Sequence, residues 1–327
     1  MDVRLARPTD AAVVLALTLD ERAHLIQSPS APGVWPVFGS LGRSAVPVVS
    51  KGRTWIARER SSVAVLVAHP RRYVMGWDIA WLAGRGSTEP VGAVIEAAIE
   101  HVQRKGVPRL FARCGTEVEE NLRSFGFRPL SRELTLRGRG TSGNEEVLPD
   151  DSRYRMPQDA WPLHQLESEV TPPFVRQLEG LSSLDWSQKR KTTSEIVIER
   201  DGKTVAWIAW GRKIGPTAQR IGMLVHPDHA DLAPILVRHV QEQAGPDTTL
   251  IARIRDYHVE SITALRDAGF ETVREDVLMV RHGALVPAKA RPRLRVAHAP
   301  SINAFPFIEA SVCAGDGPAS REKDNAT

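Results

Sequence analysis

Two carboxylates in the first part of the chain, Glu59 and Asp78, are candidates for catalysis. Both fall in segments that predict β-strands, where a carboxylate can act as a general base through a bound water. The competing interpretation is an ordinary solvent-facing strand residue. Trp77 and Trp81 lie four residues apart on one predicted strand, so we expect them to share a face. They either line a substrate groove or pack in the core.

Other chemistries lack their residues in this sequence. Only two cysteines are present, Cys114 and Cys313, and they match no metal-ligand spacing. The histidines are scattered, and no Ser-His-Asp or phosphate-loop pattern occurs. We therefore expect neither a bound metal nor a disulfide scaffold.

Length and composition are typical of a globular protein with two domains. The chain has 327 residues, 42% of them hydrophobic, and 43 Lys and Arg against 39 Asp and Glu give a net charge of +4. At about 100–200 residues per domain, we expect two domains. The small charge predicts no nucleic-acid partner. Without an apolar run of roughly 20 residues or a signal peptide, the sequence predicts no membrane association and a cytoplasmic location.

One pattern occurs in both halves of the chain. Residues 7–11 match 156–160 around a Pro-x-Asp-Ala core, and residues 122–127 match 265–270 around a Gly-Phe pair. The matches are 149 and 143 residues apart, in the same order, which favours duplication over chance. In the first match an aspartate precedes an apolar helix, where we expect it to cap the free amides. In the second a helix stops at glycine.

Between these matches the two halves predict the same order of elements. The first half predicts strands at 54–59, 63–68 and 73–83, a helix at 91–105, a strand at 109–113, a helix at 117–124 and a strand at 130–137. The second predicts strands at 195–199, 204–210 and 219–226, a helix at 232–243, a strand at 249–254, a helix at 259–267 and a strand at 273–281. This order is mixed α and β in each half.

The predicted domains are 1–138 and 153–282, with a linker at 139–152 that is rich in Gly, Ser, Thr and acids. Residues 283–327 are rich in Ala, Pro, Gly and charge, and we expect a mostly disordered tail. The tail holds six basic and four acidic residues, so half of the net charge belongs to it.

Residues 3–11, residues 96–107 and the two Gly-Phe ends resemble the GCN5-related N-acetyltransferase (GNAT) family. The chain is similar to a tandem GNAT protein over about 280 residues. The resemblance implies an α+β fold with two GNAT-like domains, each a mixed, mostly antiparallel sheet flanked by helices. It also implies acetyl transfer from acetyl-CoA to a small-molecule or peptide amine, and an oligomer is possible.

The resemblance places the cofactor pyrophosphate at the start of the central helix, where free amides and the helix dipole favour negative charge. In the first half it assigns the cofactor to Leu82, Gly84, Arg85, Gly86, Ser87, Thr88 and Val91. Arg85 and Gly86 fit the family loop, but Thr88 and either Glu89 or Pro90, depending on where one extra residue is placed, stand where glycine is expected. The alternative is a plain helix entry with Ser or Thr as the N-cap.

The second half departs further from the family pattern. Its loop, residues 227–234, has no glycine and adds Asp228 and Asp231 where phosphates would bind, so tight binding of the cofactor is not expected. The family's acid is a tyrosine in the last helix, and Leu122 and Leu265 stand there instead. Tyr257 lies about two helical turns too early.

Two functions follow. The first is an N-acyltransferase that uses the loop of the first half, with Glu59 or Asp78 as base and Trp77 and Trp81 at the acceptor. The second is a non-catalytic tandem GNAT scaffold that binds a protein or a small ligand through the old cleft. Two or more free amides at the loop favour the enzyme, whereas Glu89 or Pro90 filling that space favours the scaffold.

Overall fold

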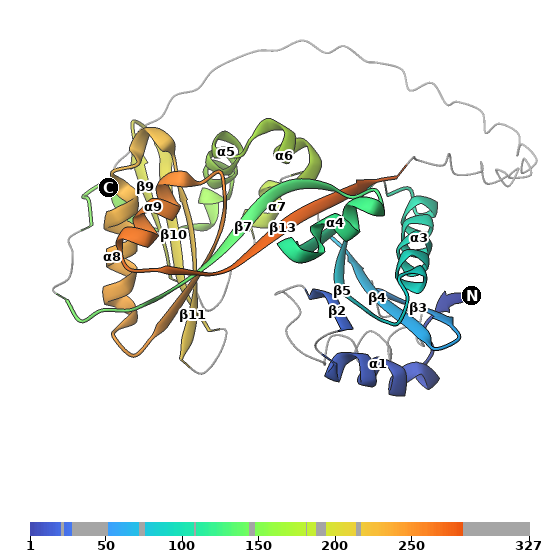
Figure 1. Cartoon of the computed structure of the whole chain (residues 1–327). Helices are drawn as coiled ribbons and strands as arrows, with labels where there is room; N and C mark the ends of the chain where they lie inside the picture. The colour runs from blue at the N-terminus through green and yellow to red at the C-terminus, as the bar shows by residue number, and fades with distance from the viewer. Residues whose placement is uncertain are drawn as a thin grey trace, which may run out of the picture. The chain divides into compact units, whose positions relative to one another are not determined.

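The computed structural model describes residues 1–20, 23–27, 52–71, 76–107, 109–143, 148–180, 182–187, 194–213 and 217–283. All of them belong to one compact unit, Met1–Ala288 (Figure 1). A second unit, Lys289–Thr327, lies outside the described residues, and so does the predicted tail beyond Gly283.

The first half follows the predicted order of elements, with one addition. Its strands are β1 (Asp2–Leu5), β2 (His24–Gln27), β3 (Arg53–Glu59), β4 (Ser62–Pro70), β5 (Trp77–Arg85), β6 (Arg109–Gly115) and β7 (Arg128–Arg139). Its helices are α1 (Ala11–Leu19), α3 (Glu89–Arg104) and α4 (Thr116–Ser124). The addition is β2, whose four residues are too short to give a periodic signal.

The second half repeats this order and adds two short helices. Its strands are β8 (Ser152–Tyr154), β9 (Ser194–Arg200), β10 (Lys203–Lys213), β11 (Ala218–Val225), β12 (Thr249–Arg255) and β13 (Glu271–His282). Its helices are α5 (Ala160–Val170), α6 (Pro173–Glu179), α7 (Ser183–Ser187), α8 (Leu232–Ala244) and α9 (Val259–Asp267). Asp201 and Gly202 join β9 to β10 with positive φ angles of 52° and 73°, which suits the twist of a tight hairpin.

All described strands join one mixed sheet, in the order β1-β3-β4-β5-β6-β13-β7-β12-β11-β10-β9-β8, with β2 on β5. The last strand of each half is exchanged. Strand β7 pairs with β12 of the second half, and β13 pairs with β6 of the first. The two exchanged strands run side by side (Figure 1). The predicted division into domains stays a prediction, since strand pairing continues across it.

The exchanged strands meet symmetrically with respect to the repeat. Glu133 on β7 faces Asp276 on β13, and each lies six residues after the phenylalanine of its Gly-Phe pair. On the outer sides, Arg255 is in register with Glu133 and Gly115 with Asp276. The crossing therefore lies on a pseudo-twofold axis of the repeat.

Each half buries the central helix that its periodicity predicts. The apolar stripe of α3 comprises Val94, Ile95, Ala98, Ile99 and Val102. That of α8 comprises Leu232, Ala233, Leu236, Val237 and Val240. Smaller cores lie under α1 and α5. Of the helices in the described ranges, none is long and apolar enough to cross a membrane.

The Pro-x-Asp-Ala match forms the same turn in both halves. Asp10 accepts hydrogen bonds of 2.7 and 2.9 Å from Arg4 and one of 2.7 Å from the amide three residues before it. Asp159 accepts two hydrogen bonds of 2.7 Å from Arg153 and one of 2.6 Å from the Met156 amide, again three residues before it. The predicted helix cap is wrong, because both carboxylates bind back to the preceding turn and make no side-chain cap bond.

These contacts stabilise the ionised carboxylates. The Arg4 hydrogen bonds hold the pKa of Asp10 below its usual value. Burial works to raise the pKa of Asp159, but the bonds from Arg153 and the backbone amide outweigh it, and the pKa is lowered.

We expect Asp10→Asn and Asp159→Asn each to lower the free energy of unfolding by about 2 kcal/mol at pH 7, because each leaves a buried arginine contact uncompensated. A lowered pKa means that the native state binds fewer protons than the unfolded state. The contribution is therefore present above about pH 5 and is lost as the pH falls below about 4.

Urea unfolding at pH 7 and pH 3 measures both effects. The control is Asp2→Asn, since Asp2 is 69% exposed and lies 3.5 Å from the same Arg4. A difference between wild type and Asp10→Asn that does not shrink at pH 3 would contradict this role.

Candidate functional site

The first cleft lies where β5 and β6 diverge. These parallel strands pair from Trp77 to Ile79 on β5 and from Leu110 to Ala112 on β6, and no further. Beyond Ile79 the edge of β5 that faced β6 is released. Such an edge presents unpaired amides and carbonyls, to which an extended ligand can bind as an added strand.

Strand β2 occupies this edge. It pairs antiparallel with β5, with Ile26 opposite Leu82 and Gln27 opposite Trp81, and it also lies against β6. The Ile26 side chain is only 1% exposed and packs in the core beneath α3. The chain therefore fills the gap between β5 and β6 with its own backbone, at the predicted cofactor residue Leu82.

The start of α3 is also occupied by its own side chains. The Ser87 amide donates to Ser62 Oγ at 2.9 Å, and the two hydroxyls lie 3.2 Å apart. Hydrogen bonds from the Ser87 hydroxyl and from its own amide lower the pKa of Glu89. Pro90 follows and has no amide to offer. Glu89 thus adds a negative charge to the first turn of α3.

The remaining loop residues have internal roles as well. Arg85 Nη2 lies 2.6 Å from Asp20 Oδ2. Gly86 has a φ of +90°, and a Cβ there would lie 2.3 Å from Ser62 Oγ. A Cβ on Gly84 would lie 2.7 Å from Val91 of α3. These glycines serve a tight turn and close packing of helix on strand. The seven predicted cofactor residues do gather at the β5–α3 junction, and their binding of acetyl-CoA stays a prediction.

The two tryptophans do not share a face. Trp77 packs in the core on the α3 side, whereas Trp81 packs in the core on the α1 side. The predicted common face is wrong, because the β4–β5 register shifts by a bulge next to Ala68, opposite residues 79–81. A bulge turns the following side chains to the other side of the sheet. At 7% and 4% exposure, both rings lie in cores.

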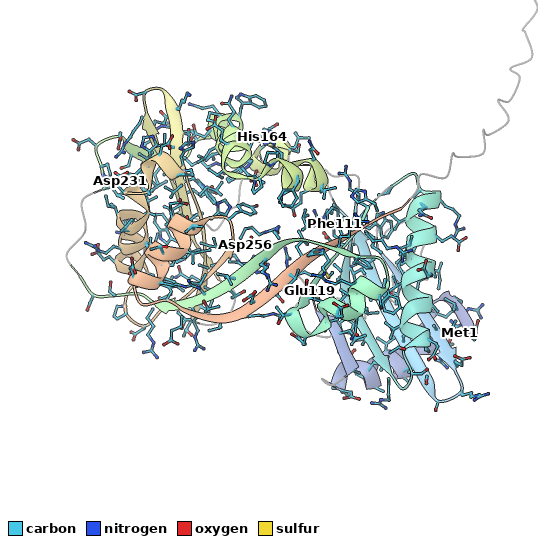
Figure 2. All side chains as sticks on the ribbon, turned by 45° about the horizontal axis from the view of Figure 1, so that its top comes forward. Met1, Phe111, Glu119, His164, Asp231 and Asp256 are labelled. Carbon is cyan, nitrogen blue, oxygen red and sulfur yellow. The ribbon has the colours of Figure 1, made fainter. Side chains whose placement is uncertain are left out.

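The two candidate bases are far apart in the sheet. Glu59 ends β3 at the β3–β4 turn, opposite Ser62, and β4 separates it from β5. The Asp78 carboxylate is held by Arg71, whose Nε lies 2.9 and 3.0 Å from its two oxygens. The Arg71 guanidinium in turn lies 3.7 Å from the centre of the Phe111 ring. Figure 2 labels Phe111, on β6 of the first half. Asp78 therefore belongs to an ionic cluster.

This ionic cluster continues across the exchanged strands. Glu179 on α6 lies 3.7 Å from Arg71 and 3.0 Å from Arg255. Glu133 lies 3.2 Å from Arg113, 3.2 Å from Arg253 and 3.3 Å from Arg255. Burial lowers the pKa of Arg113. Arginines from both halves therefore share one buried carboxylate at the crossing.

The second cleft lies where β11 and β12 diverge after Ile221 and Ala252. In the described part of the chain, no strand takes this edge of β11. Past the end of β11, His226 lies 3.8 Å from Glu169 and 3.6 Å from Asp228. His226 Nδ1 accepts a hydrogen bond of 3.3 Å from the Asp228 amide, so Nε2, on the Glu169 side, is the nitrogen that can exchange a proton.

The turn before α8 in the second half makes local hydrogen bonds and carries acidic side chains. Its turn uses the amides of Asp228, His229 and Ala230 for local hydrogen bonds. Asp231 precedes the helix, and Arg200 contacts both Asp231 at 3.4 Å and the His229 ring at 3.2 Å. Poor phosphate binding at this turn stays a prediction.

The two positions at which the family has its tyrosine acid, and the nearby Tyr257, occupy different environments. Leu122 and Leu265 are 1% and 0% exposed, so these positions face the cores. Tyr257 precedes α9, and burial raises its pKa. Its neighbour His258 is also buried, which lowers its pKa to about 4. Burial raises the pKa of Cys114 to about 12, so this thiol is no nucleophile at neutral pH.

The segment between α5 and α7 is a fixed cover of the second half. The Trp186 and Trp207 rings meet edge-on at 4.9 Å, and Trp186 Nε1 donates to Glu167 at 2.7 Å. Leu163 and Leu166 pack against the same core. Across the described ranges, no group of three or more His, Cys, Asp or Glu side chains could hold a metal ion.

No protein-family model and no curated protein sequence matches this chain. Solved structures do. The chain is similar to a tandem GNAT protein from the clavulanic acid biosynthesis pathway, at 14% identity and a TM-score of 0.53, over 86% of this chain and 99% of that one. It is also similar to a GCN5-related N-acetyltransferase from Sphaerobacter thermophilus, at 15% identity and a TM-score of 0.51, over 86% and 95%.

A putative acetyltransferase from Pyrococcus horikoshii matches at 12% identity with a TM-score of 0.50, over 87% of this chain and 90% of its own. At these identities the likeness shows the fold alone. The predicted α+β class and the GNAT fold are thereby confirmed.

The ionic cluster gives a test of stability. We expect Glu133→Gln to lower the free energy of unfolding by about 3 kcal/mol or more, because three buried arginines lose their common counter-charge. Chemical denaturation measures it. Glu120→Gln is the matched control, since Glu120 is 90% exposed and 3.8 Å from its arginine. Equal stability of the two variants would mean that the cluster contributes little.

Proposed function

We propose that this chain is a GNAT-fold protein that binds a ligand or a protein partner and does not transfer acyl groups from acetyl-CoA in its first half. The observation that carries the proposal is the pairing of β2 with β5. An extended cofactor arm would need the same strand edge, and the two cannot occupy it together.

The charge at the helix start supports the same conclusion. Glu89 places a carboxylate at the α3 N-terminus, and Arg85 is paired with Asp20. A pyrophosphate would meet repulsion from the first and would need to displace the partner of the second. The acyltransferase assignment, with acetyl-CoA as cofactor and an amine as acceptor, is the alternative. A cytoplasmic location remains part of the proposal.

Calorimetric titration of the full chain with acetyl-CoA tests the proposal. We expect no saturable heat up to several hundred micromolar cofactor, which corresponds to binding weaker than about −5 kcal/mol. The variant Arg85→Glu is the control for the first-half loop, because it reverses the one charge that fits the family pattern. Saturable heat in the wild type that Arg85→Glu abolishes would overturn the proposal and restore the enzyme.

A second candidate is acyl transfer in the second half. It is favoured by one observation: the β11 edge after Ile221 carries no strand in the described ranges, and His226 with Glu169 lies at its end. The pantetheine arm of acetyl-CoA carries amide groups that could pair with that edge and bring the thioester towards the histidine. The acidic side chains of the turn before α8 weigh against tight binding of the phosphates.

This candidate predicts release of free thiol from acetyl-CoA in the presence of simple amines. We expect His226→Gln to slow that release by about 100-fold, the usual contribution of a general base. A thiol-reactive dye measures the rate. His229→Gln is the matched control on the same turn, and an equal rate in wild type and His226→Gln would remove this candidate.

A further inference from the structure

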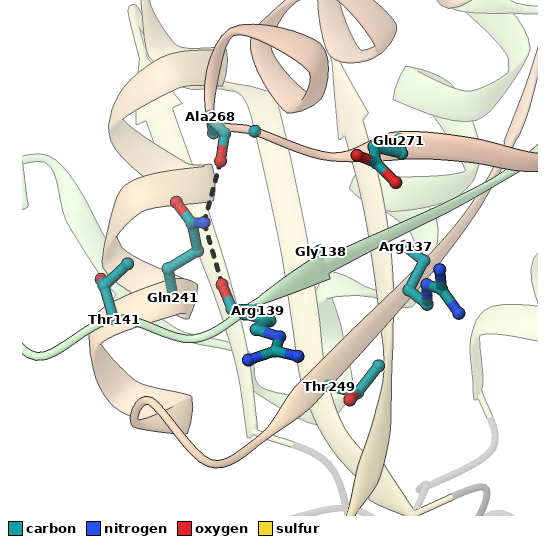
Figure 3. Close-up of a pocket in the computed structure, with 9 residues that line it drawn as sticks. Arg137, Gly138, Arg139, Thr141, Gln241, Thr249, Ala268 and Glu271 are labelled. Carbon is teal, nitrogen blue, oxygen red and sulfur yellow. Dashed lines mark hydrogen bonds between the residues drawn. The ribbon is translucent and has the colours of Figure 1, made fainter.

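A separate cavity of about 570 Å³ lies where β7 ends against the last turns of α8 and α9 (Figure 3). Its lining includes Arg137, Arg139, Thr141, Gln241, Thr249 and Glu271. The volume falls within the range of about 300–1,000 Å³ that small-molecule sites occupy. None of the cleft residues described above takes part in it.

The cavity has an ordered wall. Gln241 on α8 is 6% exposed, and its Nε2 donates to the Arg139 carbonyl at 3.0 Å and to the Ala268 carbonyl at 3.1 Å (Figure 3). The Thr141 backbone amide donates a hydrogen bond of 2.9 Å to the Gln241 backbone carbonyl. One buried amide thus ties β7 to the ends of two helices. It also covers two carbonyl oxygens that would otherwise repel an anion.

The cavity lining includes two arginines and one carboxylate, Glu271. Arg137 and Arg139 occupy alternate positions of β7, so both side chains lie on one face of the sheet. Arg139 is in register with Thr249 on β12, and Arg137 with Glu271 on β13. Within the described part of the chain, neither guanidinium has a carboxylate within 4.0 Å. The N–H groups of both guanidinium groups are therefore available to a ligand.

The equivalent place in the first half is filled. Gln103 on α3 corresponds to Gln241, and Arg281 on β13 corresponds to Gly138 on β7. Arg281 Nη1 donates to the Phe125 carbonyl at 2.7 Å and lies 2.8 Å from Glu96. The space left beside it measures about 10 Å³.

The two copies therefore differ in both volume and charge. Where the first copy has the Arg281 side chain, the second has Gly138 and an open cavity. Where the second copy has Arg137 and Arg139, the first has Val280 and His282. The cavity lining comes from both faces of the end of β7: Gly138 lies on the face of α8 and α9, and Arg137, Arg139 and Thr249 lie on the other face. The extra space and the two extra cations thus belong to the same copy and border the same cavity.

We propose that this cavity binds a small organic oxyanion, a molecule with a phosphate or carboxylate group that Arg137 and Arg139 hold. Guanidinium groups offer donors only, in a planar fork that fits two oxygens of such a group. The Thr141 and Thr249 hydroxyls supply further donors. The Glu271 carboxylate is negatively charged and can accept a hydrogen bond from a hydroxyl or ammonium group elsewhere on the ligand.

Titration of the full chain with inorganic phosphate and with succinate tests the site and distinguishes the two oxyanions. Backbone amide NMR shifts of Gly138, Thr141 and Gly269 report occupancy. We expect saturation by at least one probe in the millimolar range, and weakening of about 10-fold or more in the double variant Arg137→Gln, Arg139→Gln. Both arginines are exposed, so the double variant should fold, and its thermal unfolding checks this.

The matched control is Arg128→Gln, an exposed arginine at the other end of the same strand. It should bind either probe as the wild type does. Equal weakening by Arg128→Gln would reveal mere attraction to surface charge and overturn the proposal. No saturation by either probe would overturn it as well. The first-half loop and this cavity share no residues, so the acetyl-CoA titration and the oxyanion titration can fail independently.

Discussion

The pairing of β7 with β13 is the constraint on which the rest of the structure depends. Each strand leaves its own half and completes the sheet of the other, so neither half has a full set of strands without its partner. The crossing brings Glu133 and Asp276 into direct register, and arginines from both halves converge on Glu133. Two acids facing each other at this depth need those guanidinium groups, since burial leaves no water to screen them.

Once the two halves are tied together, equivalent positions are free to diverge. In the first half the gap between the parallel strands is filled by β2, and the gap beside α3 is filled by Arg281. In the second half the edge of β11 carries no strand within the described ranges, and Gly138 leaves a cavity beside α8. The chain thus holds one closed and one open version of each feature. Its binding chemistry is to be sought in the open versions.

The filled first cleft also illustrates that a resemblance in fold is separate from a shared reaction. The GNAT fold supplies a strand edge and a helix start, both defined by backbone groups. Here β2 pairs with the edge, and Glu89 places a carboxylate in the first turn of the helix. Both features use ordinary residues, such as Ile26 and Glu89, so the proposed loss of cofactor binding is compatible with an intact fold.

The sequence by itself determined the order of elements, the buried stripes of α3 and α8, the β9–β10 hairpin and the misfit of Glu89 in the loop. These depend on periodicity and on chemistry between near neighbours. Only the tertiary structure decided the rest. A bulge in β5 puts Trp77 and Trp81 on opposite faces. Strand β2 pairs with the edge of β5, and β7 and β13 each pair with a strand of the other half. The physical reason is that strand pairing joins residues far apart in the chain, and a shift of one residue reverses every side chain that follows.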